Sequence, residues 1–353
     1  MAIVGAPLRV ELPREHGPGF GRFDLVRGEP QGIAPPRRRR SVSGSSEPVA
    51  AIDLGTNTAL LLVARSAPGR GLEVLAQDCE AVRLGERRAS AGEGAPLSLA
   101  PEAVERTLNA LANFKTRAMN LGVAPERLRV TATAVLRRAS DAAAFVQRCE
   151  EELGLRVDIL SGAEEGRLGR SALGSSGAEE WVTLDVGGGS TELAGDGPLE
   201  QISAPVGALV LTERFLGMGS SAPLEPGGAP GLWEHVRRSF ECFPEGFARE
   251  RTVVLLGGSA SNLACLEKGL EQFDPLQVEG TRVDVGAARA WAERLIDMSP
   301  ADRERLPIES QRVEILPAGL VCIAAGLERI GARNARISAL GLRHGVALEL
   351  LHG

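Results

Sequence analysis

The amino-acid sequence carries one short pattern twice, 132 residues apart. IDLGTNTALLLV spans residues 52–63, and LDVGGGSTELA spans residues 184–194. Each copy reads as an apolar strand that ends in an aspartate, a turn of glycine and small polar residues, and a second strand. Asp53 in the first copy corresponds to Asp185 in the second, and the order of strands and helices that follows also recurs. The repeat therefore predicts an α/β chain built from two similar halves.

Hydrophobic periodicity extends this prediction along most of the chain. In the first half it predicts three antiparallel strands and then alternating helices and strands, over residues 49–55, 58–66, 71–85, 101–121, 127–135, 141–154, 155–161 and 163–174. In the second half the order starts again at residue 181 and ends with a strand over 335–341 and a helix over 342–351. We therefore expect five strands in each half, with helices between them in the same order.

The first 47 residues differ from the rest. They are rich in proline, glycine and arginine, show no apolar period, and hold eight arginines against five acidic residues. This composition is typical of a disordered segment. We expect a disordered arm over residues 1–47, a first domain over 48–174 that also takes 341–353, and a second domain over 175–340. The RRRR run at 37–40 could contact an anionic partner, although a solvated tail is the simpler interpretation.

Composition excludes several classes of function. Hydrophobic residues make up 43% and charged residues 24%, as in ordinary globular proteins. No uncharged apolar stretch is long enough to cross a membrane, and the N-terminal stretch lacks a signal-peptide core. The net charge of -6 argues against a general nucleic-acid binder. The five cysteines have no metal-ligand or redox spacing, so we expect reduced thiols in a cytoplasmic protein.

The two repeated turns are candidate phosphate-binding loops. Successive backbone N–H groups and short hydroxyls bind phosphate oxygens, and an aspartate before each turn lies where a divalent cation would bridge phosphate and protein. One such turn alone is more typical of an ordinary hairpin, but two matched turns favour function. The candidate residues are Gly55, Thr56, Asn57 and Thr58 in the first loop, Gly187, Gly188, Gly189 and Ser190 in the second, and Asp53 and Asp185 for the cation.

Three acidic residues are candidates for catalysis. Glu164 and Glu165 open a helix, where the helix dipole favours acidic side chains. One of them could instead face the cleft and deprotonate a water molecule. Glu192 follows the second loop, on a strand where a charged residue alternates with apolar ones, so it could equally be solvated.

Further candidates come from basic and glycine-rich segments. Arg83 and Arg137 each lie near the end of a predicted strand and could clamp phosphate, although surface arginine is the simpler interpretation of either one. The segment LLGGSASN places Gly257, Gly258 and Ser259 at a strand-to-helix turn that directs a helix N-terminus toward the cleft. Such turns are common in α/β proteins.

Six segments together resemble the exopolyphosphatase / guanosine pentaphosphate phosphatase (Ppx/GppA) family. They are VAAIDLGTNTALLLVAR, VTATAVLRRA, ILSGAEEGRLGRSAL, VTLDVGGGSTELA, LLGGSASNLACL and LPAGLVCIAAGLERIGARNARISALGLRHG, collinear from about residue 49 to 351. SGAEEGR and DVGGGSTE are the most diagnostic, whereas GLRHG departs from the usual GLREG. The family is part of the actin-like ATPase superfamily. The resemblance therefore implies two ribonuclease-H-like domains around a cleft, each a mixed five-stranded sheet flanked by helices. It also implies that the last helix packs back on the first domain.

The resemblance also implies an activity and roles for the candidates. The family releases terminal phosphate from inorganic polyphosphate, or the 5′ γ-phosphate from guanosine pentaphosphate, with Mg²⁺ (or Mn²⁺), and its members are commonly homodimers. Glu164 matches the general base of the GxEEAR motif, with the adjacent Glu165 as the alternative. Asp185 and Glu192 match acids that hold the metal and the attacking water, joined by Asp53. The two turns match the phosphate loops, Arg137 matches a TxxLR-like segment and Arg83 an RLG segment.

Two other functions stay open. A kinase of the same superfamily could use the same fold, since a fold does not fix a function. The acid pair at 164–165, the glutamate of GGGSTE and the absence of a recognisable sugar-binding segment favour hydrolysis. A catalytically silent sensor of polyphosphate or alarmone would bind without turnover, but the sequence shows no lost catalytic acid.

Overall fold

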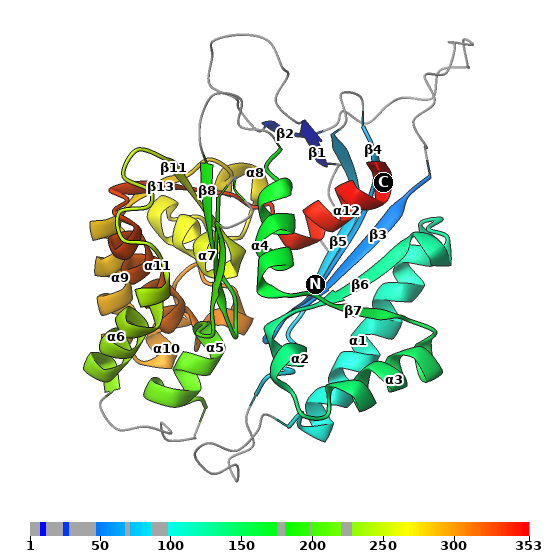
Figure 1. The fold of residues 1–353 in the computed structure, drawn as a ribbon, viewed down its shortest axis with the longest axis horizontal. Coiled ribbons are helices and arrows are strands. Elements are labelled where there is room, and N and C mark those ends of the chain that lie inside the picture. Colours follow the sequence, from blue (N-terminus) through cyan, green and yellow to red (C-terminus); the bar gives the residue numbers. More distant parts are fainter. Residues whose placement is uncertain are drawn as a thin grey trace.

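The computed structural model describes residues 8–11, 24–27, 47–67, 71–86, 98–174, 181–195, 197, 200–219 and 228–352. Two α/β halves lie side by side, each built on one sheet (Figure 1). Half I contains the sheet of order β2-β1-β5-β4-β3-β6-β7, and half II contains the sheet of order β10-β9-β8-β11-β13-β12. The duplicated architecture expected from the repeat is confirmed.

In half I, β3 (Val49–Leu54), β4 (Ala59–Ser66) and β5 (Leu72–Glu80) are antiparallel, because short loops join them in sequence. β6 (Leu128–Ala132) and β7 (Val157–Ile159) run parallel to β3, which requires helical crossovers. α1 (Pro101–Asn120) and α3 (Ala142–Leu153) provide these crossovers and bury their apolar stripes in one core with the sheet. A 3₁₀ turn (Pro125–Arg127) leads into β6.

Half II repeats this plan. β8 (Trp181–Val186), β9 (Thr191–Ala194) and β10 (Gln201–Ala204) are antiparallel, and β11 (Thr252–Leu256) and β13 (Asn334–Ile337) extend the sheet in parallel. α11 (Leu316–Ile330) is almost wholly apolar and buried, as expected for a helix enclosed by its neighbours. Those neighbours are α5 (Ala208–Leu211), α6 (Gly228–Ser239), α7 (Gly257–Lys268) and α9 (Val285–Asp297).

Shorter elements complete half II. They are a π-helical turn (Thr212–Leu216), α8 (Pro275–Val278), α10 (Pro300–Arg303), two 3₁₀ turns (Phe240–Cys242 and Ser310–Arg312) and β12 (Arg282–Asp284). β12 pairs antiparallel with β13 and makes a sixth strand that the sequence did not predict. Three residues are too few to display a period of two, so the pattern gave no signal there.

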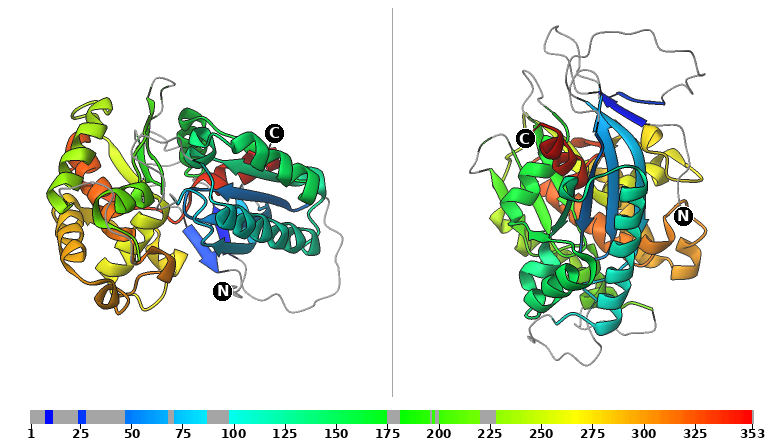
Figure 2. Two further views of the ribbon diagram at one scale, coloured as in Figure 1. Left: turned by 90° about the horizontal axis from the view of Figure 1, so that it is seen from below. Right: turned by 90° about the vertical axis from the view of Figure 1, so that its right-hand side faces the viewer.

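Two helices lie between the sheets (Figures 1 and 2). α12 (Leu342–His352) packs on β3 and β4, as the family resemblance implies for the last helix. α4 (Gly162–Ser171) follows half I in the chain but packs on β8, β9 and β10. The two helices touch closely, since a Cβ on Gly345 would lie 2.0 Å from the Leu168 carbonyl oxygen. Each helix is therefore exchanged onto the other half, and their shared apolar core joins the sheets.

One predicted strand ends early. Periodicity predicts a strand to residue 135, but β6 ends at Ala132 and α2 (Ala134–Arg138) begins two residues later. Ala132 pairs with Leu54, the last residue of β3. Beyond that point β3 has turned into the first loop and offers no partner, so the chain turns into a helix instead.

The segment expected to be a disordered arm differs in part. β1 (Leu8–Glu11) and β2 (Asp24–Arg27) form an antiparallel hairpin, and β1 pairs with β5. Without them β5 would be an edge strand with unpaired backbone groups, which favours the addition of a further strand. The other residues of 1–46 lie outside the described part of the chain.

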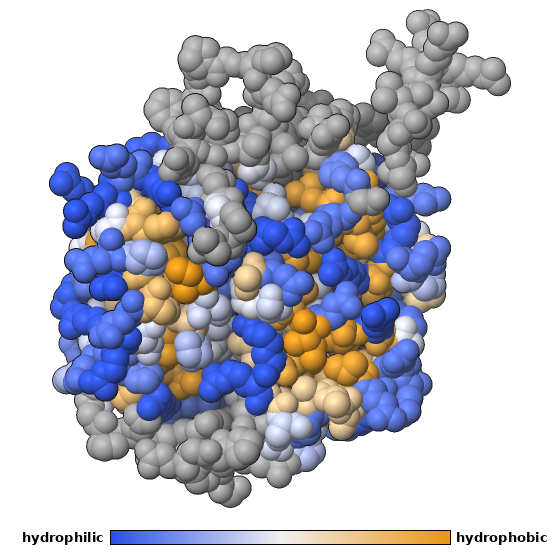
Figure 3. Space-filling view, viewed as in Figure 1, coloured by the Kyte–Doolittle hydropathy of each residue, from blue (hydrophilic) through white to orange (hydrophobic). Residues whose placement is uncertain are grey.

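The outer edges of the surface are largely hydrophilic, and the cysteines form no disulfide bonds among the described residues. Hydrophilic residues line the outer edges of both halves in the view of Figure 3. None of the described helices is long and apolar enough to cross a bilayer. All five cysteines lie in described segments and are free.

A buried acid holds the link between β13 and α12, and we expect it to make stability depend on pH. Glu279 accepts hydrogen bonds from Ser338 Oγ (2.9 Å) and the Ala339 N–H (2.8 Å), and burial raises its pKa from 4.5 to about 7. Between these two values the folded chain keeps a proton that the unfolded chain has lost, so stability falls as pH rises.

Glu279→Gln removes this dependence and keeps one acceptor oxygen. Thermal unfolding measured between about pH 5 and about pH 8 should therefore show a difference in Tm, variant minus wild type, that grows with pH. Parallel Tm curves for the two proteins would contradict the assignment.

Candidate active site

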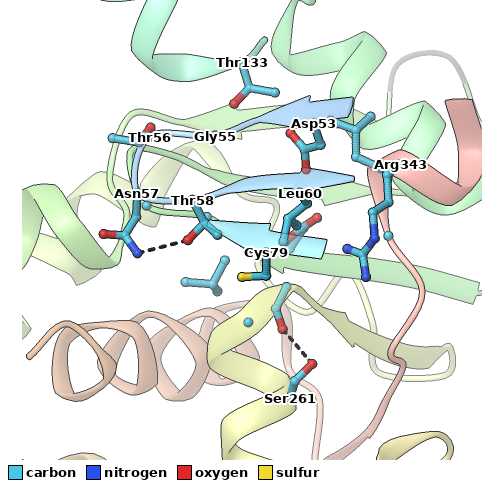
Figure 4. Close-up of a pocket in the computed structure, with 18 of the residues that line it drawn as sticks. Asp53, Gly55, Thr56, Asn57, Thr58, Leu60, Cys79, Thr133, Ser261 and Arg343 are labelled. Carbon is cyan, nitrogen blue, oxygen red and sulfur yellow. Dashed lines mark hydrogen bonds between the residues drawn. The ribbon is translucent and has the colours of Figure 1, made fainter. Parts of the chain in front are cut away.

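A cavity of about 200 Å³ lies between the halves, where β3 and β8 end. Both predicted loops line it, together with the N-terminus of α7 and the start of α12. Figure 4 shows Asp53 and Arg343 at the same end of the cavity, with Ser261 of α7 on the opposite side. The polar residues that line it are Asp53, Thr56, Asn57, Thr58, Gln77, Asp78, Thr133, Glu165, Asp185, Ser190, Ser261, Glu309, Arg312 and Arg343.

The two loops have the same turn. The Gly55 N–H donates to the Thr58 carbonyl at 3.0 Å, and the Gly187 N–H donates to the Ser190 carbonyl at 3.0 Å. The loop tips meet, since a Cβ on Gly188 would lie 3.1 Å from the Asn57 nitrogen. The repeat thus brings two matched sets of N–H groups and hydroxyls to one place, which suits the oxygens of a phosphate chain.

Two partly buried aspartates precede the loops and lie near cationic side chains. Burial is the main cause that raises the pKa of Asp53 to about 7 and that of Asp185 to about 6. Arg343 opposes the shift at both, and Arg312 opposes it at Asp185. Asp53 Oδ1 is buried without a hydrogen-bond partner. Such an oxygen is costly unless a cation or donor meets it.

A second pair of acids surrounds Arg137. Its guanidinium donates to Glu165 Oε2 (2.8 Å) and to the Leu160 carbonyl (2.7 Å), and lies 3.8 Å from Glu192 Oε1. Ser203 Oγ donates to the same Glu192 oxygen at 2.7 Å, while Glu192 Oε2 is buried without a partner. Burial and the neighbouring Glu192 raise the pKa of Glu165, and burial raises that of Glu192 to about 7. Arg137 therefore holds two carboxylates and is not itself part of the cavity lining.

The structure separates Glu164 from Glu165. Glu164 caps its own helix: it accepts from the Ser161 N–H (2.8 Å) and from Ser161 Oγ (2.7 Å), and those bonds lower its pKa. Its side chain is exposed, outside the cavity. Glu165 lines the cavity. The structure therefore places Glu165, and not Glu164, at the cavity, because the first helical turn points the two side chains in different directions. Which of the two acts as the base stays a prediction.

Two further residues that the sequence assigns to substrate binding, Arg83 and Ser259, do not line the cavity. Arg83 pairs with Glu314 at 2.9 Å, and neither residue lines the cavity. Gly257 and Gly258 do line it, but Ser259 is buried beneath α11, where a Cβ on Gly319 would meet its Oγ at 2.2 Å. Ser259 and Ser261 are two residues apart on α7, so their side chains point to nearly opposite sides of the helix, and Ser261 takes the cavity position.

Sequence reasoning missed several residues of the site. Arg312 comes from a 3₁₀ turn of half II and fills the space above Gly258, where a Cβ would lie 1.8 Å from its Cζ. Arg343 belongs to the quoted GLRHG segment, which was the one signal available for it. The buried His344 beside it accepts from the Gly341 N–H (3.2 Å), and burial lowers its pKa.

The residues could hold a divalent cation only if oxygen atoms of the substrate complete its coordination shell. Within the described segments, no three His, Cys, Asp or Glu side chains are grouped closely enough to hold a metal ion. Mg²⁺, however, commonly takes one or two carboxylates and completes its shell with water and phosphate oxygens. Asp53 and Asp185, at matched strand ends beside the two loops, would be that smaller set.

Comparison with known proteins gives a consistent pattern. The model of the Ppx/GppA phosphatase family matches residues 62–353. Exopolyphosphatase 2 of Mycobacterium tuberculosis is 32% identical over 322 residues, which cover 86% of this chain and 98% of that protein. The structure of the Aquifex aeolicus PPX-GPPA enzyme has 27% identity and a TM-score of 0.67, over 86% of this chain and 99% of that one. An exopolyphosphatase from Cytophaga hutchinsonii shares the fold (TM-score 0.71, 19% identity, 86% and 98% covered).

Proposed function

This chain belongs to the Ppx/GppA phosphatase family, and from that premise we propose that it hydrolyses the terminal phosphoanhydride bond of inorganic polyphosphate. The observation that carries the proposal is the buried Glu165 at the wall of a cavity that two matched phosphate loops also line. The name of the Mycobacterium tuberculosis relative supports polyphosphate as the first substrate to test. Guanosine pentaphosphate is the second, because its 5′ end presents the same kind of bond.

Each group of residues would have its own role in the hydrolysis. Hydrolysis of a phosphoanhydride needs little covalent help, but it needs held oxygens, spread charge and an aligned water. The N–H groups of the two loops would hold the terminal phosphate, and Arg312 and Arg343 would balance the charge of the chain. Glu165 would take the proton of the attacking water, while Arg137 keeps the carboxylate oriented. A bound Mg²⁺ or Mn²⁺, held by Asp53 and Asp185, would neutralise charge on the leaving phosphate.

The two rival functions make different demands on the site. A kinase also uses a carboxylate, which takes the proton of the acceptor hydroxyl, so the assay with a sugar acceptor separates a kinase from a hydrolase. A silent sensor needs the loops alone and gains nothing from burying Glu165 beside Glu192, a costly arrangement of like charges. The pair of acids therefore favours catalysis over sensing.

The test is phosphate release by purified full-length protein. We expect release from long polyphosphate after a divalent cation is added, and little release from protein treated with a chelator. Guanosine pentaphosphate, and ATP with a sugar acceptor, are assayed in parallel. Transfer to the sugar without free phosphate would replace the proposal with the kinase, and tight polyphosphate binding without release would replace it with the sensor.

A further inference from the structure

An ion pair joins the two halves behind the two loops of the site. Arg83 Nη2 of half I lies 2.9 Å from Glu314 Oε2 of half II, and the other carboxylate oxygen accepts from the Gly219 N–H at 2.6 Å. The two charged residues are 231 positions apart in the sequence. They have 33% and 24% of their side-chain surfaces exposed, so the pair is partly shielded from solvent.

On the side of half I, the turn that carries Arg83 supports the first phosphate loop. The Arg83 N–H donates to the Asn57 carbonyl at 2.8 Å, and the Gly85 N–H donates to the Thr56 carbonyl at 2.9 Å. Gly85 lies against Thr56 so closely that a Cβ would meet the Thr56 methyl at 2.2 Å. Among the described non-glycine residues, only Arg83 has a positive φ, at 46°. This strained backbone directs its side chain out of the turn and toward the other half.

On the side of half II, the chain next to Glu314 supports the second phosphate loop. Ile315 packs against Ala208 and Leu209 of α5 in a small apolar cluster. The N–H groups of those two residues donate to the carbonyls of Gly187 and Gly188, each at 2.9 Å. Glu314 is therefore attached to the back of the second loop, as Arg83 is attached to the back of the first.

We propose that Arg83 and Glu314 form a strut that sets the spacing of the two phosphate loops, so that both are positioning residues. This rests on the proposed function. The sequence assigned Arg83 to substrate binding, but its guanidinium is engaged by Glu314 and lies outside the cavity lining. An ion pair this exposed contributes little to overall stability. Its position matters more, because it connects two supports whose separation fixes where the terminal phosphate meets both loops.

The test is a double-mutant cycle of Arg83→Asn and Glu314→Gln. Asparagine tolerates the left-handed backbone at position 83, so the guanidinium is removed without added strain. We expect each single variant to lower kcat for polyphosphate by about fivefold, and the double variant to be no worse than either. KM should change by less than about twofold. Glu328→Gln is the matched control, because the Arg289–Glu328 pair has similar length (3.0 Å) and exposure but lies within half II.

Other outcomes would overturn the strut. If Arg83 binds substrate directly, Arg83→Asn raises KM in both backgrounds and Glu314→Gln lowers it by freeing the guanidinium. Amide hydrogen exchange without substrate keeps this test separate from the proposed activity. We expect either single variant to speed exchange both in the turn at 83–86 and in α5. Exchange that rises on one side alone, or on neither, contradicts the strut even in a protein with no turnover.

Discussion

Replacement of Glu165 by glutamine is expected to reduce phosphate release by about 10²- to 10⁴-fold, the usual contribution of a general base. The amide keeps the size of the side chain and an oxygen for Arg137, but it cannot take a proton from water. Since Glu165 is buried beside Glu192 and desolvation raises its pKa, removal of the charge should leave the fold at least as stable. Substrate affinity should change little, because the loops and the cationic side chains remain. Steady-state phosphate release and polyphosphate binding are measured on the same preparation.

Glu164→Gln is the matched control for this prediction. It sits one residue away on the same helix and makes the same chemical change. Its carboxylate caps the helix through Ser161 and faces solvent. Because glutamine also serves at this position of a capping box, we expect activity within about twofold of wild type and little loss of stability. If Glu164→Gln abolished release and Glu165→Gln did not, the assignment made from the structure would be wrong.

The repeat explains why so much of the fold follows from the sequence. Each copy places a buried strand, an aspartate and a turn in the same order, and the strands around the turn are apolar runs that are long enough to be recognised. These signals are local, so Asp53, Asp185 and both loops were identified before any contact between them was known. Local signals did not predict where a strand ends when its pairing strand sets that end. β6 ends at Ala132 because β3 has no further residue to pair with.

The chemistry of the acids depends on direction, which a sequence does not display. Glu164 and Glu165 are identical in type and adjacent, and both suit the first turn of a helix. What separates them is a rotation of about 100° around the helix axis. The side chain of Glu164 therefore contacts Ser161, and that of Glu165 contacts Arg137. Arg312 and Arg343 were missed for a related reason. Their segments show no phosphate-loop pattern. Arg343 reaches the cavity because α12 packs on half I, and Arg312 because its 3₁₀ turn packs over Gly258.

Apart from the acidic residues, the substitution expected to lower turnover most is that of Gly207, the residue before α5. Its backbone is extended (φ -155°), a conformation that any residue adopts, so glycine is required by contact and not by the dihedral angle. A Cβ there would lie 2.6 Å from the Gly188 carbonyl carbon and 2.7 Å from the Gly189 nitrogen. Both are backbone atoms of the second phosphate loop, and no rotation of a side chain can relieve the clash. The methyl group of Gly207→Ala should therefore push the loop away from α5.

We expect Gly207→Ala to lower kcat for phosphate release by about 100-fold, the loss typical of a misplacement of about 1 Å in a site of this kind. Overpacking should also destabilise the chain by about 1–3 kcal/mol, so thermal unfolding is measured first and activity is compared well below the Tm.

Gly286→Ala is the control: it adds the same methyl at the start of α9, where the nearest atom is the Asp284 side chain at 3.1 Å. That side chain can move, so activity should be unchanged. A folded Gly207→Ala protein with wild-type kcat would show that the second loop does not need its observed position, and the role given to both loops would fail with it.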